Sequence, residues 1–581
     1  MTPLPSSPDV PPTTIDLRDP SAVCVIGSGP AGLVTAAELV RQGVSVTLLE
    51  SGRVDHDHEL QALSDGEYAG DPLNASNIVE NRTRRLAGNA NAWVVKTAGE
   101  KHAAQMGLRY GFLNGDDFAE RPWIEGSGWP FDVAELEPWF ESAHRHYAIG
   151  AYNYAPPNDL RPDALGDDFW RDFDAKWFRF GVSDRYRSEL VELLQSSPLA
   201  RIEVSATATK LVRSEVGGPI ERVDYCTADG EAGTVEAKRF VLACGAIENA
   251  RLLLASDRAA GGIGNEHDHV GRYFMDHPLF SIGHIEIDRQ PTKGDDAIGA
   301  MGFFDLAPHN GEMVHGYAAT SRALTEELGA TQIGLSIFPR PNERQLAAAE
   351  ALKWFVHDPA GHLRDRRTLT ATVKTVCKGL DYFPRAAYNS LIRHRSLLPG
   401  FGRGGWADGH DGMAFTRLEV VFQCEQPPLA ESRVTLGYEN DRFGTPLPHV
   451  DWRAGSQVRE SVLAVQRRLA DHVEASGIGH YVPRAGSFDE LGVPSSMAHH
   501  LGTTRMSEGP EDGVVDPNGR VHSVPNLYIA GSSVFPTSGY MNPTLTIVAL
   551  AERLAHHLAT TPAPVTPAGP TDRSGAPQVQ N

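Results

Sequence analysis

Near the N-terminus, two continuous runs of apolar residues flank a segment in which apolar residues recur at helical spacing. Residues 22–26 form a short apolar run, which is typical of a buried parallel strand. Residues 33–42 carry helical periodicity and end at Gly43, and residues 44–49 form a second apolar run. The pattern predicts a strand, a helix and a second strand in that order.

The turn between the first strand and the helix is rich in glycine. Gly27, Gly29 and Gly32 have the GxGxxG spacing, in which the glycines permit the tight turn, the approach of a pyrophosphate and the packing of the helix. Ala31, which lies in the same turn, is also predicted to contact the cofactor. Glu50 ends the second apolar run, where a carboxylate accepts hydrogen bonds from the adenosine ribose and disfavours a 2′-phosphate. A glycine-rich turn of another α/β unit is the alternative, which the order of strand, helix, strand and acid disfavours.

Similar apolar segments recur far along the chain, at residues 239–254 and 526–558, so one sheet must be assembled from distant pieces. Alternating patterns at residues 414–424 and 432–436 are typical of an antiparallel sheet roofing the nucleotide site. We therefore expect an α/β fold with two domains. The Rossmann-like domain is assembled from discontinuous segments, residues 21–95, 200–275 and 491–559. The substrate domain, with an antiparallel sheet and helices, comprises residues 96–199 and 276–490.

Composition narrows the class of protein. The chain has 581 residues, of which 41% are hydrophobic and 22% charged, enough for a large core. Its net charge of -21 argues against nucleic acid as a partner, because phosphate binders concentrate Lys and Arg. No stretch reads as a signal peptide or membrane span. We expect a soluble enzyme.

The cysteines and the two ends of the chain add to this picture. The five cysteines are scattered without CxxC spacing, which indicates reduced thiols and predicts a cytoplasmic protein. Residues 1–20 and 560–581 are rich in Pro, Ser, Thr and Gly, so we expect disordered tails.

Residues 341–403 form a basic helical insertion that departs from the acidic average of the chain. Two interpretations fit: a surface that docks on a membrane or partner, and a solvated helical excursion that packs on another subunit. The second is the simpler and is favoured.

Two motifs near the C-terminus carry the chemistry. Residues 499–503 read HHLGT, which fits H-x-x-G-T, and Asn542 precedes the sequence PTLTI. With these motifs the chain resembles the glucose-methanol-choline (GMC) oxidoreductases, as it does at residues 120–140, 270–278 and 425–436. The resemblance spans nearly all of the chain between the tails. It implies that the Rossmann-like domain is an FAD-binding domain and that the enzyme oxidises alcohols.

The chemistry of alcohol oxidation requires such a pair of residues. Transfer of a hydride from the carbinol carbon to flavin N5 requires the hydroxyl proton to leave, and imidazole accepts protons well near neutral pH. We assign His499 as this general base. Asn542 donates to the substrate oxygen and orients it. Pro543 and Thr544 begin the last helix, whose positive end in the family faces the flavin.

The histidine pair admits two other interpretations. His500 stands next to His499, so the register is open to a shift of one position, although His499 alone fits the motif. The pair has no Cys, His or acidic partner at ligand spacing, so we expect no metal.

The flavin-contacting segments depart from the family pattern. Relatives that attach FAD covalently do so through a His in this loop, and by resemblance the corresponding residue of this chain is Ala92. Alanine cannot form such a bond, so we expect FAD to be bound non-covalently. Ala87 replaces the first glycine of the flavin loop, and Gly531 replaces a usual Asp, for which Ser532 or backbone amides substitute. By resemblance, the further cofactor contacts are Gly88, Asn91, Ala208, Gly531, Ser532, Asn542, Pro543 and Thr544.

The sequence indicates only the class of the substrate. Gln423 and Glu425 share one face of a predicted strand and are candidates for the floor of the substrate site. Local sequence resembles bacterial members that act on sugars, cyclitols or glycosides, while sterols and small aliphatic alcohols stay open. The electron acceptor (oxygen, a quinone or a protein) and the oligomeric state are not readable. A redox-silent lyase with structural FAD is the alternative function, and a flavin-binding module without catalysis is disfavoured by the retained pair.

Overall fold

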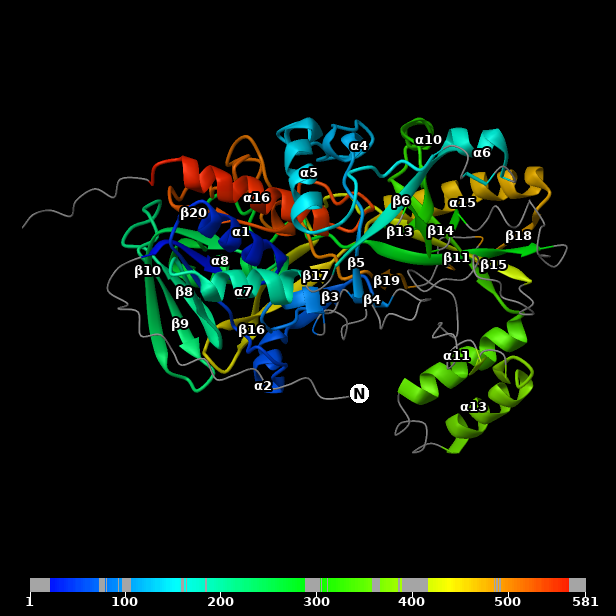
Figure 1. Ribbon diagram of the computed structural model, residues 1–581, viewed down its shortest axis with the longest axis horizontal. Helices are drawn as coiled ribbons and strands as arrows, with labels where there is room; N and C mark the ends of the chain where they lie inside the picture. The colour runs from blue at the N-terminus through cyan, green and yellow to red at the C-terminus, as the bar shows by residue number, and fades with distance from the viewer. Residues whose placement is uncertain are drawn as a thin grey trace, which may run out of the picture.

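The computed structural model describes residues 21–72, 79, 81–91, 94–96, 106–157, 161–162, 165–182, 185–287, 303–304, 306–310, 312–357, 366–384, 387–388, 416–484, 486, 490 and 493–563. The two predicted tails fall outside it, apart from residues 560–563. Figure 1 shows an elongated molecule with a sheet towards each end and helices along one side.

The first sheet is the nucleotide-binding one. In the described residues it has seven strands: β1 (Ser21–Ile26), β2 (Val46–Leu49), β7 (Ala200–Glu203), β8 (Ala206–Val212), β9 (Arg222–Thr227), β10 (Ala232–Leu242) and β20 (Leu527–Ile529). A parallel core runs in the order β7, β2, β1, β10, β20, and β8 and β9 extend it antiparallel from β10. The predicted Rossmann-like α/β architecture, assembled from distant segments, is confirmed.

Four helices pack around this sheet: α1 (Pro30–Arg41), α7 (Leu190–Ser196), α8 (Ala246–Ser256) and α16 (Thr544–Thr560). Helix α1 contacts α16 and α7, and α8 contacts β8. Helix α1 begins three residues before the predicted stripe because proline at its first position and Gly29 at its N-cap already favour a helical turn.

The second sheet is antiparallel. Its ten strands in the described part of the chain are β4 (Val94–Lys96), β5 (Met106–Tyr110), β6 (Phe173–Val182), β11 (Pro278–Ile287), β12 (Leu306–His309), β13 (Glu312–Thr320), β14 (Ile333–Arg340), β15 (Arg417–Cys424), β18 (Gly479–Pro483) and β19 (Ser495–Ser496). Helix α15 (Ser456–Ser476) packs on β11, β15 and β18 through a stripe of buried valine and leucine. This apolar cluster is a core separate from that of the nucleotide-binding part.

A small third sheet joins the two parts. It contains β3 (Glu67–Gly70), β16 (Arg433–Asn440) and β17 (Pro446–Trp452), with β3 parallel to β17. Residues 433–436 of the predicted segment 432–436 therefore lie in this sheet, in contact with α8, and not in the antiparallel sheet as expected. β3 belongs to the predicted FAD-binding segment 21–95 and β17 to the predicted substrate segment 276–490, so this small sheet is built from both, and the domain division stays a prediction.

Shorter helices connect these layers. They are α2 (His58–Gln61), α4 (Gly115–Phe118), α5 (Glu137–His146), α6 (Gly166–Asp172) and α10 (Arg322–Leu328). Among the described residues, no helix is long and apolar enough to cross a membrane.

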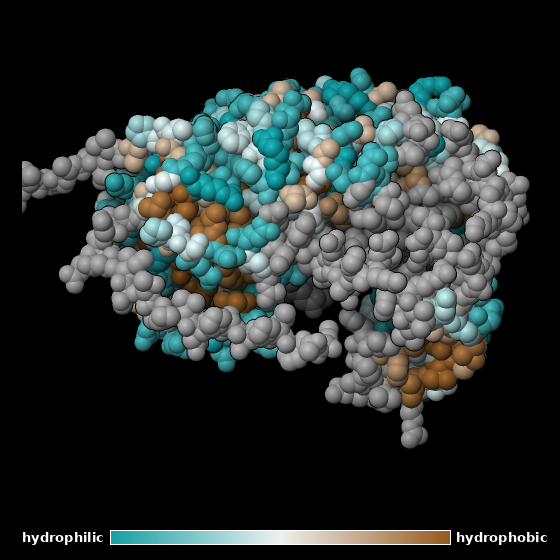
Figure 2. Space-filling model, in the orientation of Figure 1, coloured by the Kyte–Doolittle hydropathy of each residue, from teal (hydrophilic) through white to brown (hydrophobic). Residues whose placement is uncertain are grey.

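The described part of the basic insertion is a pair of helices, α11 (Glu343–His357) and α13 (Arg366–Lys378), which lies apart from the sheets at the lower right of Figure 1. The two helices contact each other, and Arg344 of α11 forms a two-fold ion pair with Asp381. Trp354 and Val373 are exposed on this pair. A hydrophobic (brown) patch is visible over this part of the molecule at the lower right of Figure 2. The helical prediction for this segment therefore holds where it is described.

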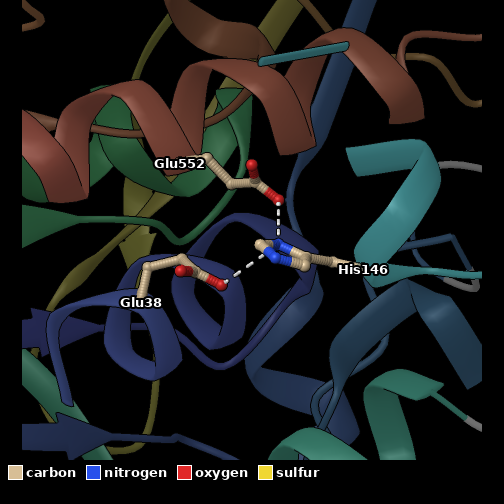
Figure 3. A group of neighbouring side chains, drawn as sticks. All are labelled: Glu38, His146 and Glu552. Carbon is tan, nitrogen blue, oxygen red and sulfur yellow. Dashed lines mark hydrogen bonds and ion pairs between the residues drawn. The ribbon is translucent and has the colours of Figure 1, made fainter. Parts of the chain in front are cut away.

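A buried pair of carboxylates lies where α1, α5 and α16 meet. Glu38 of α1 and Glu552 of α16 point towards the imidazole of His146, which stands between them (Figure 3). His146 Nδ1 is 3.3 Å from Glu552 Oε1 and 3.7 Å from Glu38 Oε1, and Arg41 also pairs with Glu38. Burial, assisted by the neighbouring Glu38, raises the pKa of Glu552.

We expect Glu552→Gln to stabilise the fold at alkaline pH. A carboxyl whose pKa is raised by folding favours the folded state at low pH, and this advantage is lost as the pH rises through the raised pKa. Glutamine keeps the shape without the charge. Thermal unfolding at matched FAD content should show a Tm gain of about 2 °C at pH 8 that shrinks at pH 5. A variant less stable than the parent at both pH values would contradict this.

Candidate active site

The glycine-rich turn after β1 is shaped by close backbone approaches. A Cβ on Gly27, whose φ is +98°, would stand 2.6 Å from the carbonyl oxygen of Ala243, and a Cβ on Gly32 would stand 1.8 Å from that of Gly27. Gly29, the N-cap of α1, has no atom within 4 Å of its Cβ position. The turn therefore leaves open space at the positive end of α1, where a pyrophosphate is favoured.

Glu50 is buried at the end of β2 with its carboxylate held from two sides. The backbone N–H of Ser28 donates to Oε2 at 3.0 Å, and that of Gly52 donates to Oε1 at 2.6 Å. Burial raises the pKa of Glu50, although these hydrogen bonds and Arg84 oppose the rise. The side chain lines the cleft and keeps acceptor capacity for ribose hydroxyls.

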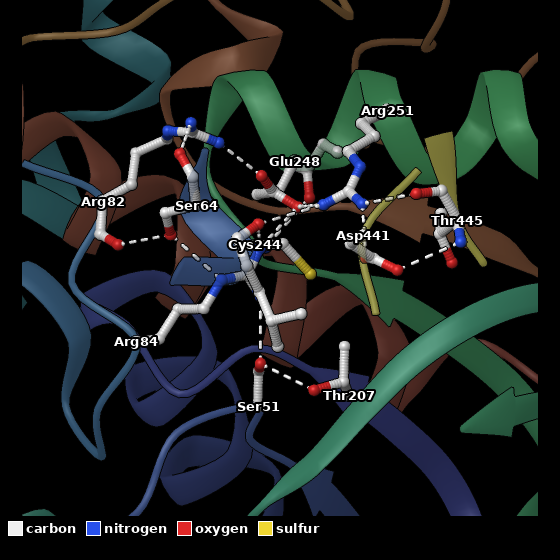
Figure 4. A network of polar contacts seen from close by, with 12 residues as sticks. Ser51, Ser64, Arg82, Arg84, Thr207, Cys244, Glu248, Arg251, Asp441 and Thr445 are labelled. Atoms are coloured by element: carbon white, nitrogen blue, oxygen red, sulfur yellow. Dashed lines mark hydrogen bonds and ion pairs between the residues drawn. The ribbon is translucent and has the colours of Figure 1, made fainter. Parts of the chain in front are cut away.

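An arginine network that sequence reasoning missed forms one wall of the cleft (Figure 4). Arg82, Arg84 and Arg251 all pair with the carboxylate of Glu248 on α8. These three cations lower the pKa of Glu248 to about 2, despite its burial. Arg251 also pairs with Asp441 at 2.6 Å. The network leaves an excess of positive charge beside the space at α1, which suits a diphosphate. The run RTRR at residues 82–85 was the available signal.

The predicted flavin loop lies against the glycine-rich turn. A Cβ on Gly88 would stand 3.1 Å from the Cα of Gly29, and the Ala87 N–H donates to Ser28 Oγ at 3.2 Å. Asn91 donates to two backbone carbonyls of its own loop, while its buried Oδ1 has no hydrogen-bond partner within the described residues. Ala92, the position that bears on covalent attachment, lies outside the described residues.

Three further predicted contacts line the same cleft. Gly531 has φ +109°, and a Cβ there would stand 3.6 Å from Ala31 Cβ. Ser532 donates its hydroxyl to the His500 carbonyl at 2.6 Å, so it positions the H-x-x-G-T segment. Ala208 lies beside Thr207, whose hydroxyl is 2.9 Å from that of Ser51.

These three residues belong to one open cleft, whose volume of about 1420 Å³ includes the solvent at its mouth. It is lined by Glu50 and Ala208, by the glycine-rich turn, and by His499 and Pro543. The residues fit FAD: glycines leave room for the pyrophosphate, three arginines line the cleft, and the buried Nε2 of His500 has no hydrogen-bond partner within the described residues. Glu50 would hold the ribose and α1 the pyrophosphate.

His499 is buried and held by the segment that precedes β11. Its backbone N–H donates to Asp276 Oδ1 at 2.9 Å, and its Nδ1 is 2.8 Å from Nδ1 of His277. The two rings meet edge to face at 81°. Sequence reasoning missed Asp276 and His277, although the MDHP motif containing both was visible.

His500 points differently from its neighbour. Its ring packs on Phe274, and burial lowers its pKa to about 3. Nε2 has no hydrogen-bond partner among the described residues, and the side chain lines the cleft. His500 is therefore a cofactor-contact candidate that the sequence did not indicate.

Asn542 precedes the last helix at the cleft. The helix begins at Thr544 with Pro543 as its N-cap, one residue later than predicted, because Pro543 lacks an N–H and its carbonyl accepts from Ile547 at 2.9 Å. Pro543 and Ile547 line the cleft, so the positive end of α16 faces it.

The structure gives Gln423 and Glu425 other contacts. Gln423 donates its amide to the Tyr540 carbonyl, two residues before Asn542. Glu425 is fully buried in an ion pair with Arg121, one arm of which measures 2.7 Å. Gln423 therefore supports the loop that leads to Asn542, and the role of both residues in substrate binding stays a prediction.

Comparisons with known proteins agree with this geometry. Residues 428–551 match the GMC oxidoreductase family model, and residues 20–64 match an FAD binding domain. The chain is 24% identical to paromamine 6'-oxidase of Streptomyces fradiae, covering 94% of this chain and 93% of the relative. It is 25% identical to the fructose dehydrogenase large subunit of Gluconobacter japonicus, covering 92% and 96%. Pyridoxine 4-oxidase from Mesorbium loti shares the fold, with a TM-score of 0.52 at 16% identity, covering 92% of this chain and 99% of that chain.

We expect Glu50→Arg to purify largely without FAD. The change replaces an acceptor for the ribose with bulk and positive charge, and should weaken FAD binding by more than about tenfold. Glu50→Gln, which keeps the size and one acceptor, should retain an intermediate amount. Flavin content is measured against protein absorbance. A Glu50→Arg protein that purifies with full flavin would show that the assignment of Glu50 is wrong.

The similarity is not confined to the nucleotide-binding segment that many folds share. Relatives align along nearly the whole chain, and the family model covers the segment that carries His499 and Asn542. Residues 428–551 therefore match the GMC oxidoreductases, which the chain resembles along nearly its whole length, and the protein is an FAD-dependent enzyme that acts on CH–OH donors.

Proposed function

We propose that the protein oxidises one CH–OH group of a sugar, cyclitol, glycoside or other polyol to a carbonyl, with His499 as general base. The observation that carries this proposal is the placement of a buried histidine, with its imidazole bonded to His277 and its backbone N–H bonded to Asp276, in the same cleft as the dinucleotide-binding turn. An imidazole fixed there is positioned to take a proton from a substrate bound over the flavin.

Each residue of the pair has a distinct task. Bound FAD supplies a hydride acceptor at N5. His499 removes the hydroxyl proton, and the amide of Asn542 donates to the substrate oxygen and aligns the carbinol hydrogen. The positive end of α16 stabilises negative charge at this end of the cleft.

The names of relatives support a polyol substrate. Paromamine 6'-oxidase and fructose dehydrogenase align along most of the chain, and C-glycoside 3-oxidase of Arthrobacter globiformis is 46% identical over 23% of it. One relative, cholesterol oxidase of Mycobacterium tuberculosis, bears a sterol name, but it matches only 16% of this chain.

A panel of alcohols tests the proposal without assuming an electron acceptor. Under anaerobic conditions D-glucose, D-fructose, myo-inositol and methyl glucosides are mixed with the enzyme, with cholesterol and 2-methyl-1,2-propanediol as comparison alcohols. We expect at least one of the polyols to bleach the visible flavin absorption. Bleaching by the comparison alcohols alone would overturn the polyol assignment, and no bleaching by any alcohol would favour the redox-silent lyase.

Substitutions at the site should separate the two histidines. We expect His499→Ala to retain FAD and to slow anaerobic flavin reduction by at least about a hundredfold, the usual effect of losing a positioned base. Asn542→Ala should slow anaerobic flavin reduction by a smaller factor. His500→Ala is the matched control: even if its affinity for FAD falls, once it is saturated with FAD its rate of flavin reduction should stay within a few-fold of the parent. If His500→Ala reduced its flavin very slowly and His499→Ala nearly normally, the general base would be His500 and not His499.

The rate of flavin reduction should rise with pH through one ionisation and then level off. Only neutral imidazole accepts the proton, and an ordinary histidine loses its charge near pH 6.5. His500 does not produce this step, because its pKa of about 3 keeps it neutral throughout the assay range. Stopped-flow measurements between about pH 5 and 9 check the profile. A rate that falls as the pH rises would contradict a neutral base.

A further inference from the structure

Two imidazoles share one hydrogen bond at the site. Nδ1 of His277 and Nδ1 of His499 are 2.8 Å apart, with ring centroids 5.0 Å apart and planes at 81°. A bond between two ring nitrogens needs a proton on one and a lone pair on the other. The position of that proton therefore decides which nitrogen of His499 carries its lone pair.

The other contact of His277 locates the proton. Nε2 of His277 is 3.1 Å from the backbone carbonyl oxygen of Ser538, and a carbonyl only accepts, so Nε2 carries a hydrogen. His277 is fully buried, and this burial lowers its pKa to about 4. Neutral His277 then has its lone pair at Nδ1, and the shared proton belongs to Nδ1 of His499.

We infer that His277 is a positioning residue that fixes the tautomer of His499, so that Nε2 of His499 carries the lone pair that takes the substrate proton. This inference rests on the proposed function of His499. In a neutral imidazole, the hydrogen bond at one nitrogen selects which nitrogen is the base. His277 thus acts on the reaction through His499.

The same dipeptide also fixes the backbone of His499. Asp276 Oδ1 accepts from the backbone N–H groups of His277 and His499 at 2.7 and 2.9 Å, and Ser496 donates its hydroxyl to Asp276. Ala498, directly before His499, has φ +58°, a left-handed conformation that costs energy for alanine. Asp276 therefore holds a strained turn in place while His277 orients the ring.

His277 connects the two catalytic segments. Its acceptor, the buried Ser538, lies four residues before the half-buried Asn542, and the Ser538 hydroxyl is bonded to the backbone of Gln426. One ring therefore bridges the segment of His499 and the segment that leads to Asn542. This bridge fixes the base and the substrate-orienting amide in one frame.

The charges around His277 favour its neutral form. The nearby carboxylate of Glu425 acts to raise the pKa of His277, but Glu425 is committed to an ion pair with Arg121. The carboxylate of Asp276 is engaged by backbone and hydroxyl donors. When His499 gains a proton, neutral His277 accepts from the imidazolium and stabilises it, which raises the basicity of His499.

A pair of variants separates this role from simple packing. His277→Phe keeps the ring size but removes the acceptor, whereas His277→Asn is smaller and places an amide oxygen near the position of Nδ1. With the alcohol that bleaches the parent fastest, we expect His277→Phe to slow flavin reduction by about 10- to 100-fold and to move the midpoint of the pH profile to lower pH. His277→Asn should stay within about threefold of the parent. A parent-like rate in His277→Phe, or an equal loss in both variants, would overturn the inference.

A second measurement needs no substrate. In the holoenzyme with 15N-labelled histidine, the ring signals of His499, identified by their absence in His499→Gln, should show a protonated Nδ1 and an unprotonated Nε2. In His277→Phe they should shift to the opposite tautomer. Signals with a protonated Nε2 in the parent would overturn the inference. If His499→Ala reduces its flavin normally, the proposed function fails; if only His277→Phe is normal, the positioning role alone fails.

Discussion

The register of three parallel strands determines where the chemistry of this protein can occur. Ile26 of β1 stands opposite Leu242 of β10, which stands opposite Ile529 of β20. The ladder continues past the strand ends, with the Ala243 N–H donating to Ile26 and the Ala530 N–H donating to Leu242, both at 2.8 Å. Turns from three distant parts of the chain therefore leave the sheet at one edge, where α/β proteins bind ligands. A slip in this register would separate the glycine-rich turn from the segment of His499.

Charge at this edge is arranged by burial and pairing. Three arginines share the carboxylates of Glu248 and Asp441, so this network keeps an excess of positive charge beside α1, and the nearby carboxylate of Glu50 is held by backbone donors of its own. Burying the three arginines without Glu248 would cost desolvation free energy that Asp441 alone would not offset. If every arginine were fully neutralised, no positive charge would be left to attract a diphosphate. Towards the substrate domain, Arg121 and Glu425 neutralise each other within hydrogen-bond distance. The arginine network beside α1 therefore has more positive than negative groups, whereas the pair of Arg121 and Glu425 has one of each.

The sequence predicted those parts of the site whose role is set by local geometry. The turn at Gly27 to Gly32 and Glu50 could be assigned because strand, turn and helix are contiguous, and His499 because its motif is short. The arginines could not, because Arg82 acts through Glu248 on a helix far along the chain. His277 was missed for the same reason: its function depends on a contact with a residue 222 positions away. Residues 433–436 went to a different sheet from the one expected because alternation indicates a strand but not its partner.

The adjacent histidines show how one short segment serves two ligands. In an extended stretch, neighbouring side chains point to opposite sides. His499 turns towards His277, which controls its ring nitrogens, while His500 packs on Phe274 and leaves Nε2 at the cofactor cleft without a described partner. Burial keeps His500 neutral, with a pKa of about 3, so it acts as a hydrogen-bonding group and not as a base. The proton chemistry is thereby assigned to the one imidazole whose tautomer is fixed, and the neighbouring ring is free to serve the cofactor.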